Sequence, residues 1–159
     1  MDSGLESYLK ENSIGYKLYR HPAVHKVQES KRLKSKIPGL HCKALFLKDE
    51  NGTFYLVGMK ADKKLDTKII RSHFKIKKLH FASEQELETE LKTTPGTVSI
   101  YNLVNAKNPG IILIIDKEIL RSESSGFHPN TNTETITLDS NNMERYLNSL
   151  EIKKVILEL

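Results

Sequence analysis

Residues 43–60 read KALFLKDENGTFYLVGMK, the clearest structural signal in the chain. Two apolar runs, 43–49 and 53–60, flank the residues ENG at 50–52. An Asn-Gly pair between two apolar runs is the strongest short-range signal for a β-hairpin, because both residues tolerate positive φ. The stretch therefore predicts two antiparallel strands whose leucine, phenylalanine and valine side chains enter the core.

Short helices and further strands alternate on either side of this hairpin. Strands are expected at residues 16–20, 97–104, 111–116, 135–138 and 155–159. Helices are expected from a capping box at Ser3 and Glu6, over residues 27–33, after Asp66, from a second capping box at Ser83 and Glu86, and after Asp139 or Ser140. Strands joined by both a hairpin and helical crossovers predict a mixed sheet. The fold class is therefore α/β or α+β, with a single domain over residues 1–159.

The chain has 159 residues, one cysteine (Cys42) and a net charge of +5. This length suggests one domain. A single cysteine excludes a disulfide framework and favours a reducing compartment. The N-terminal MDSGLESYLK lacks the apolar region of a signal peptide, and no apolar run approaches the ~18 residues of a membrane span. We expect a soluble cytoplasmic protein.

Basic side chains gather in two segments of the first half, 26–36 and 60–78. A basic surface favours polyanionic partners such as nucleic acid. Solvated lysine-rich faces are also common in proteins that bind no polyanion. The charge pattern thus leaves an RNA-binding face and an ordinary solvated face both open.

Most standard catalytic and metal-binding motifs are absent. The sequence has no C-x-x-C, H-E-x-x-H, Walker or G-x-S-x-G pattern, so neither a metal nor a cofactor is expected. Cys42 stands at the head of a strand, where packing is a commoner role than nucleophilic attack. Lys43 follows it, and its ammonium either reaches solvent or points into a cleft to bind an anion.

Two polar loops complete the set of candidates. The TTPGTVS stretch at 93–99 has N–H groups and hydroxyls suited to holding a carbonyl or ester oxygen, although an ordinary helix-to-strand turn has the same composition. The GFHPNTNTET stretch at 126–135 places His128 among hydroxyl and amide side chains. From the residues alone, the sequence predicts a polar, cation-lined cleft and no more specific function.

Six segments in this order give the chain a resemblance to the YbaK and ProX proteins, trans-editing relatives of the insertion domain of bacterial prolyl-tRNA synthetase. The segments are HPAV (21–24), IPGLHCKALFLKD (37–49), FYLVGMKADKKLD (54–66), LHFASEQEL (79–87), TPGTVS (94–99) and FHPNTNTETITL (127–138). The chain looks most similar to the branch that hydrolyses alanyl-tRNA(Pro). The resemblance implies a strongly curved mixed β-sheet wrapped by helices, with a pocket at its open face.

The family resemblance also implies a reaction, the removal of small amino acids that prolyl-tRNA synthetase has attached wrongly to tRNA(Pro). A synthetase pocket sized for proline discriminates against smaller side chains by only ~1–3 kcal/mol, so a second site removes the mistakes. By this resemblance Lys43 stabilises negative charge that develops on the ester, and His128 lines the pocket and orients the substrate. No protein nucleophile is implied, because the terminal ribose hydroxyl of the tRNA helps to activate water.

The resemblance and the basic segments together give the expected site residues. The catalytic residues are Lys43 and His128; the substrate-binding residues are Met59, Gly96, Thr97, Val98, Ser99 and Pro129; the RNA-binding residues are Arg32, Lys60, Lys63 and Lys64. Two positions depart from the family pattern. Ile100 stands where proline is usual, and Ala44 stands where relatives of the alanyl branch carry asparagine.

Three functions are compatible with these residues. The first is a deacylase for alanyl-tRNA(Pro). The second is a deacylase for another small amino acid (cysteine, serine or threonine), since Ile100 and Ala44 change the pocket wall. The third is a binding module for tRNA or synthetase that has lost catalysis. The expected partner is the acceptor end of tRNA(Pro), with prolyl-tRNA synthetase as a second partner to test, and no membrane.

Overall fold

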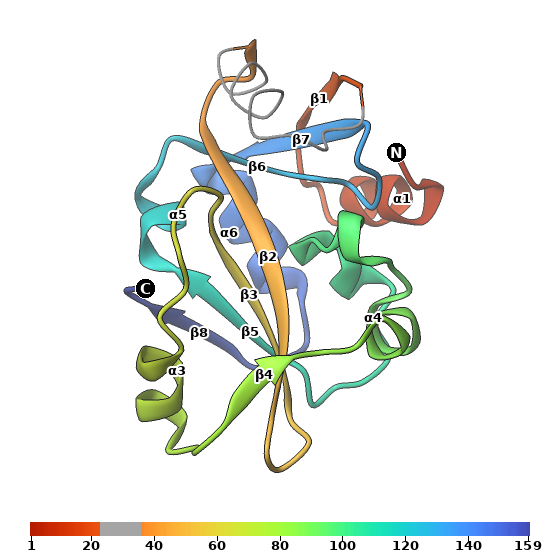
Figure 1. The fold of residues 1–159 in the computed structure, drawn as a ribbon. Helices are drawn as coiled ribbons and strands as arrows, with labels where there is room; N and C mark the ends of the chain where they lie inside the picture. The colour runs from red at the N-terminus through yellow and green to blue at the C-terminus, as the bar shows by residue number, and fades with distance from the viewer. Residues whose placement is uncertain (23–35) are drawn as a thin grey trace.

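The computed structural model describes residues 1–22 and 36–159, and Figure 1 shows their arrangement. The helix expected over residues 27–33 lies outside the described residues, as do most of the basic segment 26–36 and Arg32.

The described residues form one eight-stranded mixed sheet. Its strands are β1 Lys17–Arg20, β2 Leu40–Asp49, β3 Phe54–Lys60, β4 Leu79–Phe81, β5 Ile112–Asp116, β6 Ser124–Phe127, β7 Glu134–Asp139 and β8 Lys154–Leu157. Their order is β1-β7-β6-β2-β3-β5-β8, and β4 pairs with β2. The pairs β2–β6, β3–β5 and β5–β8 are parallel, whereas the other pairs are antiparallel. The mixed sheet expected from the sequence is confirmed.

β2 and β3 form the expected antiparallel hairpin. Its turn differs from the Asn-Gly turn that the sequence predicts, because Gly52 has a φ of 82° but Asn51 is not among the residues with positive φ. The carboxylate of Asp49 holds the turn instead. One of its oxygens accepts hydrogen bonds from the N–H groups of Asn51 (2.8 Å) and Thr53 (3.0 Å).

Short helices surround the sheet. The described helices are α1 Ser3–Glu11, α3 Thr67–Phe74, α4 Glu84–Leu91, α5 Lys117–Arg121 and α6 Ser140–Ser149, with 3-10 helices η1 Pro95–Thr97 and η2 Ile100–Val104. Asp66 caps α3 and Asp139 caps α6, each by accepting a hydrogen bond from a main-chain N–H. The capping box expected at the start of α4 is also present. The sequence patterns did not predict α5, β4 or β6.

Two local expectations are wrong. Asp2 rather than Ser3 caps α1, because the Asp2 carboxylate accepts the hydrogen bond at the first turn of the helix. Residues 97–104 form the end of η1 and then η2 instead of a strand. The side chains of Ser99 and Asn102 make a reciprocal capping box there. These polar side chains satisfy main-chain groups that a strand would pair with a neighbour.

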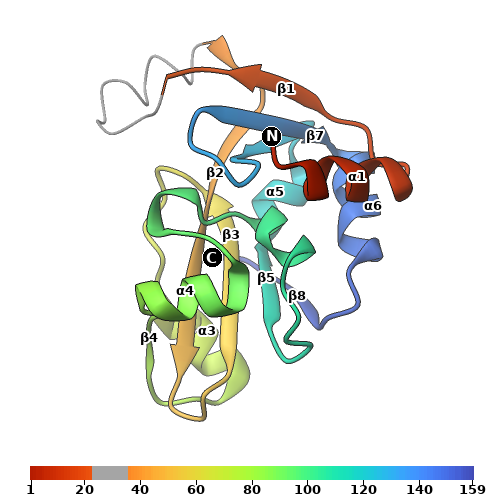
Figure 2. The same cartoon turned by 90° about the vertical axis from the view of Figure 1, so that its right-hand side faces the viewer.

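The two faces of the sheet pack into separate apolar clusters. The first cluster joins the sheet to α1, α4, α6 and η2, and it contains the buried rings of Phe46, Tyr101, Phe127 and Tyr146. The second cluster joins the sheet to α3 and includes Met59. Figure 1 shows α3 and α4 on opposite sides of β2 and β3, and Figure 2 shows α1 beside α6.

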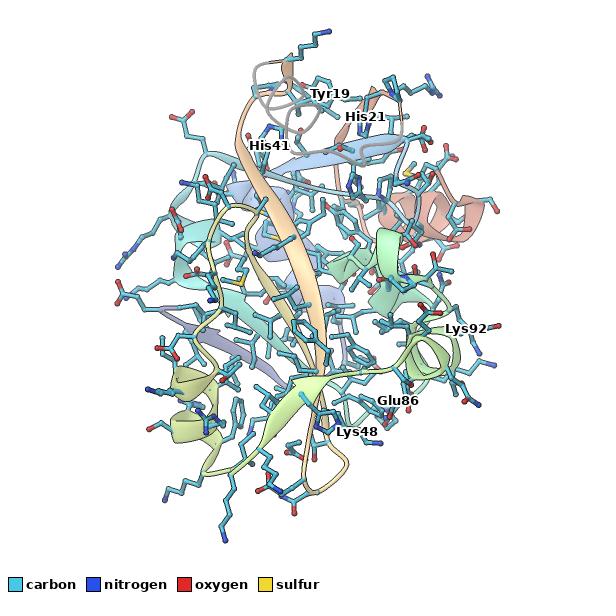
Figure 3. The ribbon with its side chains drawn as sticks, viewed as in Figure 1. Tyr19, His21, His41, Lys48, Glu86 and Lys92 are labelled. Atoms are coloured by element: carbon cyan, nitrogen blue, oxygen red, sulfur yellow. The ribbon has the colours of Figure 1, made fainter. Side chains whose placement is uncertain are left out.

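An ion pair ties α4 to the sheet. Nζ of Lys48 on β2 lies 2.7 Å from a carboxylate oxygen of Glu86 on α4, and Figure 3 shows the two side chains together. The hydrogen bond from Lys48 lowers the pKa of Glu86 to about 2. α4 ends at Leu91, shortly before Gly96. The ion pair therefore helps to hold the start of the segment that carries Gly96 in place.

Candidate active site

One face of the sheet collects polar side chains from β2 and β7. His41 pairs with Gly126 on β6, which in turn pairs with Thr137. Paired residues direct their side chains to the same face, and so do residues two apart along a strand. Lys43 and Thr135 therefore share the face of His41 and Thr137. We call these four residues, His41, Lys43, Thr135 and Thr137, the polar face.

His21 and His128 meet at the edge of the polar face. Figure 3 shows His21 at the same end of the molecule as His41. Nε2 of His21 lies 2.9 Å from the hydroxyl of Thr135, and the ring centroids of the two histidines are 5.9 Å apart. Nδ1 of His128 lies 2.8 Å from the main-chain oxygen of Glu134. A carbonyl oxygen only accepts hydrogen bonds, so Nδ1 carries the proton and Nε2 keeps its lone pair.

The imidazole of His128 is held in its neutral form. Burial lowers its pKa below the ordinary value of 6.5, and the nearby His21 lowers this pKa further, against an opposing contribution from the hydrogen bond to Glu134. Nε2 has no hydrogen-bond partner among the described residues. A neutral imidazole with a free lone pair can accept a hydrogen bond or a proton from water or from an amine.

A cavity of about 640 Å³ adjoins the histidine pair. It is lined by Met1, Asp2, Arg20, His21, Asn130, Thr131, Thr133 and Glu134. The carboxylate of Glu134 on this wall pairs with the N-terminal ammonium of Met1, and its other oxygen lies 3.4 Å from the Arg20 guanidinium. The loop that carries His128 therefore borders a hollow with mainly polar walls.

Residues 93–99 form a turn that threonine side chains hold together. The hydroxyls of Thr93 and Thr97 lie 2.6 Å apart. Gly96 is exposed and has no positive φ, and a Cβ at this position would meet no atom within 4 Å. Neither the backbone nor the packing requires glycine here. The missing side chain leaves this surface open to close approach by a bound molecule.

Asn102 joins this turn to the His128 loop, and sequence reasoning missed it. The residue is fully buried. Its Oδ1 accepts a hydrogen bond from the N–H of Ser99 at 2.6 Å, and its Nδ2 donates to Oδ1 of Asn130 at 2.5 Å. The Ser-x-x-Asn spacing at 99–102, which is a capping pattern, is the signal that could have revealed it. The predicted turn and the loop of His128 are thus one connected unit.

Lys43 makes no hydrogen bond to this unit. Its ammonium donates to the main-chain oxygen of Lys63, in the segment that follows β3. An ammonium has three protons, so two remain available for an anion. The register places Lys43 on the same face as the histidine pair, but no hydrogen bond from Lys43 to Gly96 or His128 is present among the described residues.

Met59 and Lys63 have structural roles. Met59 pairs with Lys43 across the hairpin, so the two side chains lie beside each other on one face, and Met59 is fully buried in the second cluster. Nζ of Lys63 lies 2.9 Å from Asp116 and 3.1 Å from Glu118. The hydrogen bond to Asp116 raises the pKa of Lys63. The charge of Lys63 is therefore balanced inside the protein, which weakens the case for Lys63 as an RNA contact.

The other predicted residues divide into buried and exposed groups. Ser99 and Pro129 are buried, and Val98 packs against the first cluster. Lys64 is exposed, and Nζ of Lys60 lies 3.7 Å from Asp62. The exposed lysines are thus the ones that can meet a polyanion.

Cys42 is unsuited to nucleophilic attack. Burial raises the pKa of its thiol to about 12, and its Sγ lies 3.5 Å from the main-chain oxygen of Leu40. A thiol with this pKa is protonated at neutral pH, whereas the thiolate is the nucleophile. The packing role expected from the sequence agrees with this environment.

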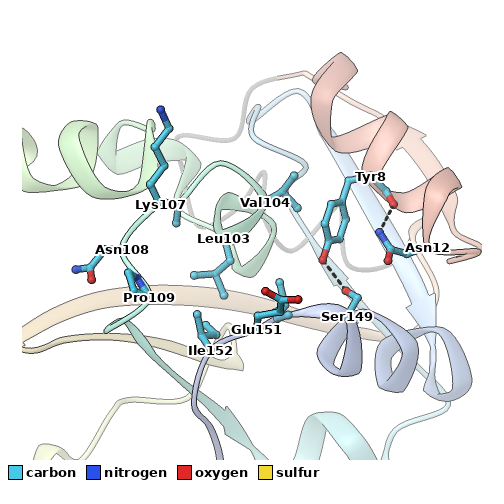
Figure 4. Close-up of a pocket in the computed structure, with 12 residues that line it drawn as sticks. Tyr8, Asn12, Leu103, Val104, Lys107, Asn108, Pro109, Ser149, Glu151 and Ile152 are labelled. Atoms are coloured by element: carbon cyan, nitrogen blue, oxygen red, sulfur yellow. Dashed lines mark hydrogen bonds between the residues drawn. The ribbon is translucent and has the colours of Figure 1, made fainter.

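A second cavity, of about 400 Å³, lies between α1, η2 and the end of α6 (Figure 4). The hydroxyl of Tyr8 lies 2.7 Å from that of Ser149 on its wall. None of the site residues expected from the sequence lines this cavity.

Comparison with known proteins identifies the family. The sequence model of the aminoacyl-tRNA editing domain matches residues 21–146. The chain belongs to the aminoacyl-tRNA editing family. Editing by this family is hydrolysis of the ester between an amino acid and the tRNA, so the chain is an aminoacyl-tRNA deacylase and tRNA carries its substrate.

Two curated proteins are similar to this chain over most of their length. The prolyl-tRNA editing protein ProX of Acetoanaerobium sticklandii is 32% identical over 138 residues, which cover 86% of this chain and 84% of that protein. The prolyl-tRNA synthetase associated domain-containing protein 1 of Danio rerio is 27% identical over 155 residues, which cover 96% of this chain and 84% of that protein.

A solved structure supports the fold. It is described as a candidate trans-editing enzyme for prolyl tRNA synthetase, and it superposes with a TM-score of 0.75 at 16% identity, covering 100% of this chain and 99% of that one. At this identity the likeness concerns the fold alone. Within the described ranges, no helix combines the length and apolar character that crossing a membrane requires.

Ile100 stands at the position where the resemblance led us to expect a proline. The side chain of Ile100 is fully buried in the first cluster. Its main-chain oxygen accepts a hydrogen bond of 2.6 Å from the hydroxyl of Tyr146. Packing and this hydrogen bond therefore anchor the end of the 93–99 turn without the restricted φ of a proline.

Proposed function

We propose that this editing domain hydrolyses alanyl-tRNA(Pro) in trans, in the cytoplasm where proteins are made. The proposal rests on the names of the two curated relatives, one a prolyl-tRNA editing protein and the other a prolyl-tRNA synthetase associated domain protein. It rests also on the order of the motifs around Lys43, Gly96 and His128. Alanine is a small amino acid of the kind that a proline-sized synthetic site excludes poorly.

In the proposed reaction, water attacks the carbonyl carbon of the aminoacyl ester. The bond from that carbon to the ribose oxygen breaks, the ribose oxygen takes up a proton, and free alanine leaves. The ammonium of Lys43 stabilises negative charge on the ester or on the terminal adenosine phosphate. The 93–99 turn positions the ester, and the terminal ribose hydroxyl helps to activate the water.

The observation that carries the proposal is the state of His128. A main-chain oxygen holds its Nδ1 proton and its ring is neutral, so Nε2 keeps a free lone pair, and the neighbouring His21 and Asn130 line a polar cavity. Lys43 lies on the same face of the sheet. A hydrogen-bond acceptor and a cation on one face suit a substrate that has an ammonium group, a carbonyl and phosphates. We propose that His128 accepts a hydrogen bond from the attacking water or from the α-ammonium.

The test is a panel of tRNA(Pro) charged with alanine, cysteine, serine, threonine or proline. The rate of amino-acid release is measured with micromolar protein and compared with the rate in buffer. We expect the largest acceleration for alanine and none for proline. No acceleration for any amino acid, together with tight, salt-sensitive tRNA binding, would instead indicate a binding module.

A second substrate class is favoured by Ala44. Relatives of the alanyl branch carry asparagine there, so this chain lacks one polar side chain next to Lys43. Fastest release of cysteine, serine or threonine in the same panel would establish that alternative. A complex with prolyl-tRNA synthetase is a separate proposal, and co-elution of the two proteins with and without tRNA tests it.

A further inference from the structure

Strand β2 lies inside the sheet, but on one side the middle part of the strand has no neighbouring strand among the described residues. One of its edges pairs with β3 along almost the whole strand. The other edge pairs with β6 only at Leu40 and His41, and with β4 from Leu47 to Asp49, where the oxygen of Phe46 also accepts from the N–H of Ala82 just after β4. Figure 1 shows β6 meeting β2 near its start and β4 crossing it near its end. The residues between these two contacts have no strand beside them on this edge.

The hydrogen-bond pattern shows which main-chain groups point to the open edge. The oxygen of His41 accepts from the N–H of Ala61, and the N–H of Asp49 donates to the oxygen of Thr53, so odd-numbered residues of β2 bond toward β3. Even-numbered residues therefore bond the other way. The main-chain N–H and C=O of Ala44 consequently face the open edge. Neither group has a partner among the described residues.

Ala44 is buried, so we expect its main-chain N–H and C=O groups to have hydrogen-bond partners. Its relative exposure is 7%. Nearly all buried main-chain groups in proteins are paired with protein or with ordered water. A second buried polar group also lacks a hydrogen-bond partner in the part of the chain that the structure describes. The hydroxyl of Tyr101 is fully buried and has no partner among the described residues. Burial raises the pKa of Tyr101, and the charge of the nearby Cys42 raises this pKa further.

A partner that satisfies both groups of Ala44 needs one donor and one acceptor, spaced as in one amino-acid residue. In an antiparallel sheet, two directly opposed residues exchange two hydrogen bonds, N–H to O=C in each direction. An aminoacyl ester carries an ammonium and a carbonyl on neighbouring atoms, as a residue of a strand does. We propose that the aminoacyl group of the substrate pairs with the main chain of Ala44 as a single-residue extension of the sheet. This inference rests on the proposed function.

The pairing assigns a role to each main-chain group. The C=O of Ala44 accepts a hydrogen bond from the α-ammonium. The N–H of Ala44 donates to the ester carbonyl oxygen, which becomes negatively charged as water adds, so this donor strengthens in the transition state. Both contacts use atoms that every amino acid has. The Ala44 main chain therefore positions the ester, and other groups select the side chain.

The first test removes the ammonium from the substrate and leaves the protein unchanged. Wild-type protein is given alanyl-tRNA(Pro) and propionyl-tRNA(Pro), and each release rate is divided by its own rate in buffer. We expect the acceleration to be at least tenfold smaller for the propionyl ester. Equal accelerations would overturn the proposed pairing. If alanyl-tRNA(Pro) itself is not hydrolysed, the proposed function has failed rather than this inference.

The second test removes the N–H donor. Ala44→Pro deletes an N–H that the β2–β3 ladder does not use, and proline is tolerated on a strand edge without a neighbour. Ala44→Gly is the matched control that keeps the N–H. We expect hydrolysis of alanyl-tRNA(Pro) to be at least tenfold slower for Ala44→Pro than for Ala44→Gly. Wild-type activity in a folded Ala44→Pro protein would refute the proposal. If circular dichroism shows that this variant is unfolded, the propionyl comparison decides.

Discussion

The side-chain amide of Asn102 donates a hydrogen bond of 2.5 Å to the side-chain oxygen of Asn130, so one buried residue holds two loops together. The same side chain accepts from the N–H of Ser99 at 2.6 Å. The 93–99 turn and the loop of His128 thus have a fixed relative position before any substrate binds. Such positioning matters because misplacement by about 1 Å can cost ~100-fold in rate.

Removing this link should reduce activity more than stability. Asn130 has a φ of 65°, so Asn130→Gly removes the side chain without forcing another residue into a left-handed conformation. We expect a decrease of about tenfold in kcat/KM, and a loss of about 1 kcal/mol in the free energy of unfolding, the typical net value of one hydrogen bond. Asn130→Asp keeps the oxygen that accepts from Asn102, but it replaces the amide that donates to Asp2 at 3.4 Å with a carboxylate oxygen, so its activity should fall between those of Asn130→Gly and wild type. Equal rates for Asn130→Gly and wild type would refute the positioning role.

The pKa of His128 predicts an acid limb in the pH profile. This pKa is lowered from 6.5, so the neutral ring persists below pH 6.5 and is lost as the pH falls through the lowered value. The acceleration of ester hydrolysis over buffer should therefore be constant from neutral pH down to below 6.5 and then decline. His128→Gln cannot titrate there, so it should be slower at pH 7 and should lack this limb.

The same shift predicts how stability depends on pH. A group whose pKa is lower in the folded state stabilises the fold at pH values above its unfolded pKa, and this contribution is lost as the pH falls through the folded pKa. The free energy of unfolding of the wild type should decrease on acidification more steeply than that of His128→Gln. Denaturant titrations between pH 7 and pH 5 measure both slopes. Parallel slopes would show that His128 is not buried in its neutral form.

Cys42 should be chemically inert. Its pKa of about 12 leaves almost no thiolate at pH 8. Alkylation by iodoacetamide should be at least tenfold slower than in the urea-unfolded chain, because the thiolate is the reactive form and an unperturbed thiol has a pKa of about 8.5. Cys42→Ala should keep deacylation within about threefold of wild type, as expected for a residue outside the chemistry. Rapid alkylation with loss of activity would instead indicate that Cys42 takes part in catalysis.

Lys64 should contribute to RNA affinity through charge. It is exposed, and no ion pair of its side chain is present among the described residues. Lys64→Glu should weaken tRNA binding and reduce the slope of log K against log salt concentration by about 1, the value for one phosphate contact. Lys107→Glu makes the same charge change on the wall of the second cavity, so it is the control (Figure 4). Equal losses for both variants would indicate a nonspecific effect of net charge.

The elements that the sequence predicts correctly are local. The β2–β3 hairpin follows from two apolar runs around a turn, and the caps at Asp66 and Asp139 follow from a carboxylate just before an apolar periodic segment. Each of these needs only neighbouring residues. The wrong strand at 97–104 shows the limit of this approach. Its apolar residues favour a strand, but the side chains of Ser99 and Asn102 satisfy the main chain in a 3-10 helix.

The parts of the site that the sequence missed depend on distant residues. His21 meets Thr135 across 114 positions, and Asn102 meets Asn130 across 28 positions. β6 has the sequence SSGF, which has little strand character of its own, and it is held by pairing with β2 and β7. Composition and periodicity do not encode such contacts. The resemblance to the editing family supplied the candidate residues, and their catalytic roles remain predictions.

The role of Lys43 in ester hydrolysis is measured by the release of alanine from alanyl-tRNA(Pro) with wild-type protein and with Lys43→Ala. We expect rapid release by the wild type and a rate at least ~100-fold lower for Lys43→Ala, the size of effect expected when one group that stabilises developing charge is lost. Thermal unfolding of both proteins should show that the variant is folded. A Lys43→Ala protein that releases alanine as fast as the wild type would contradict the account.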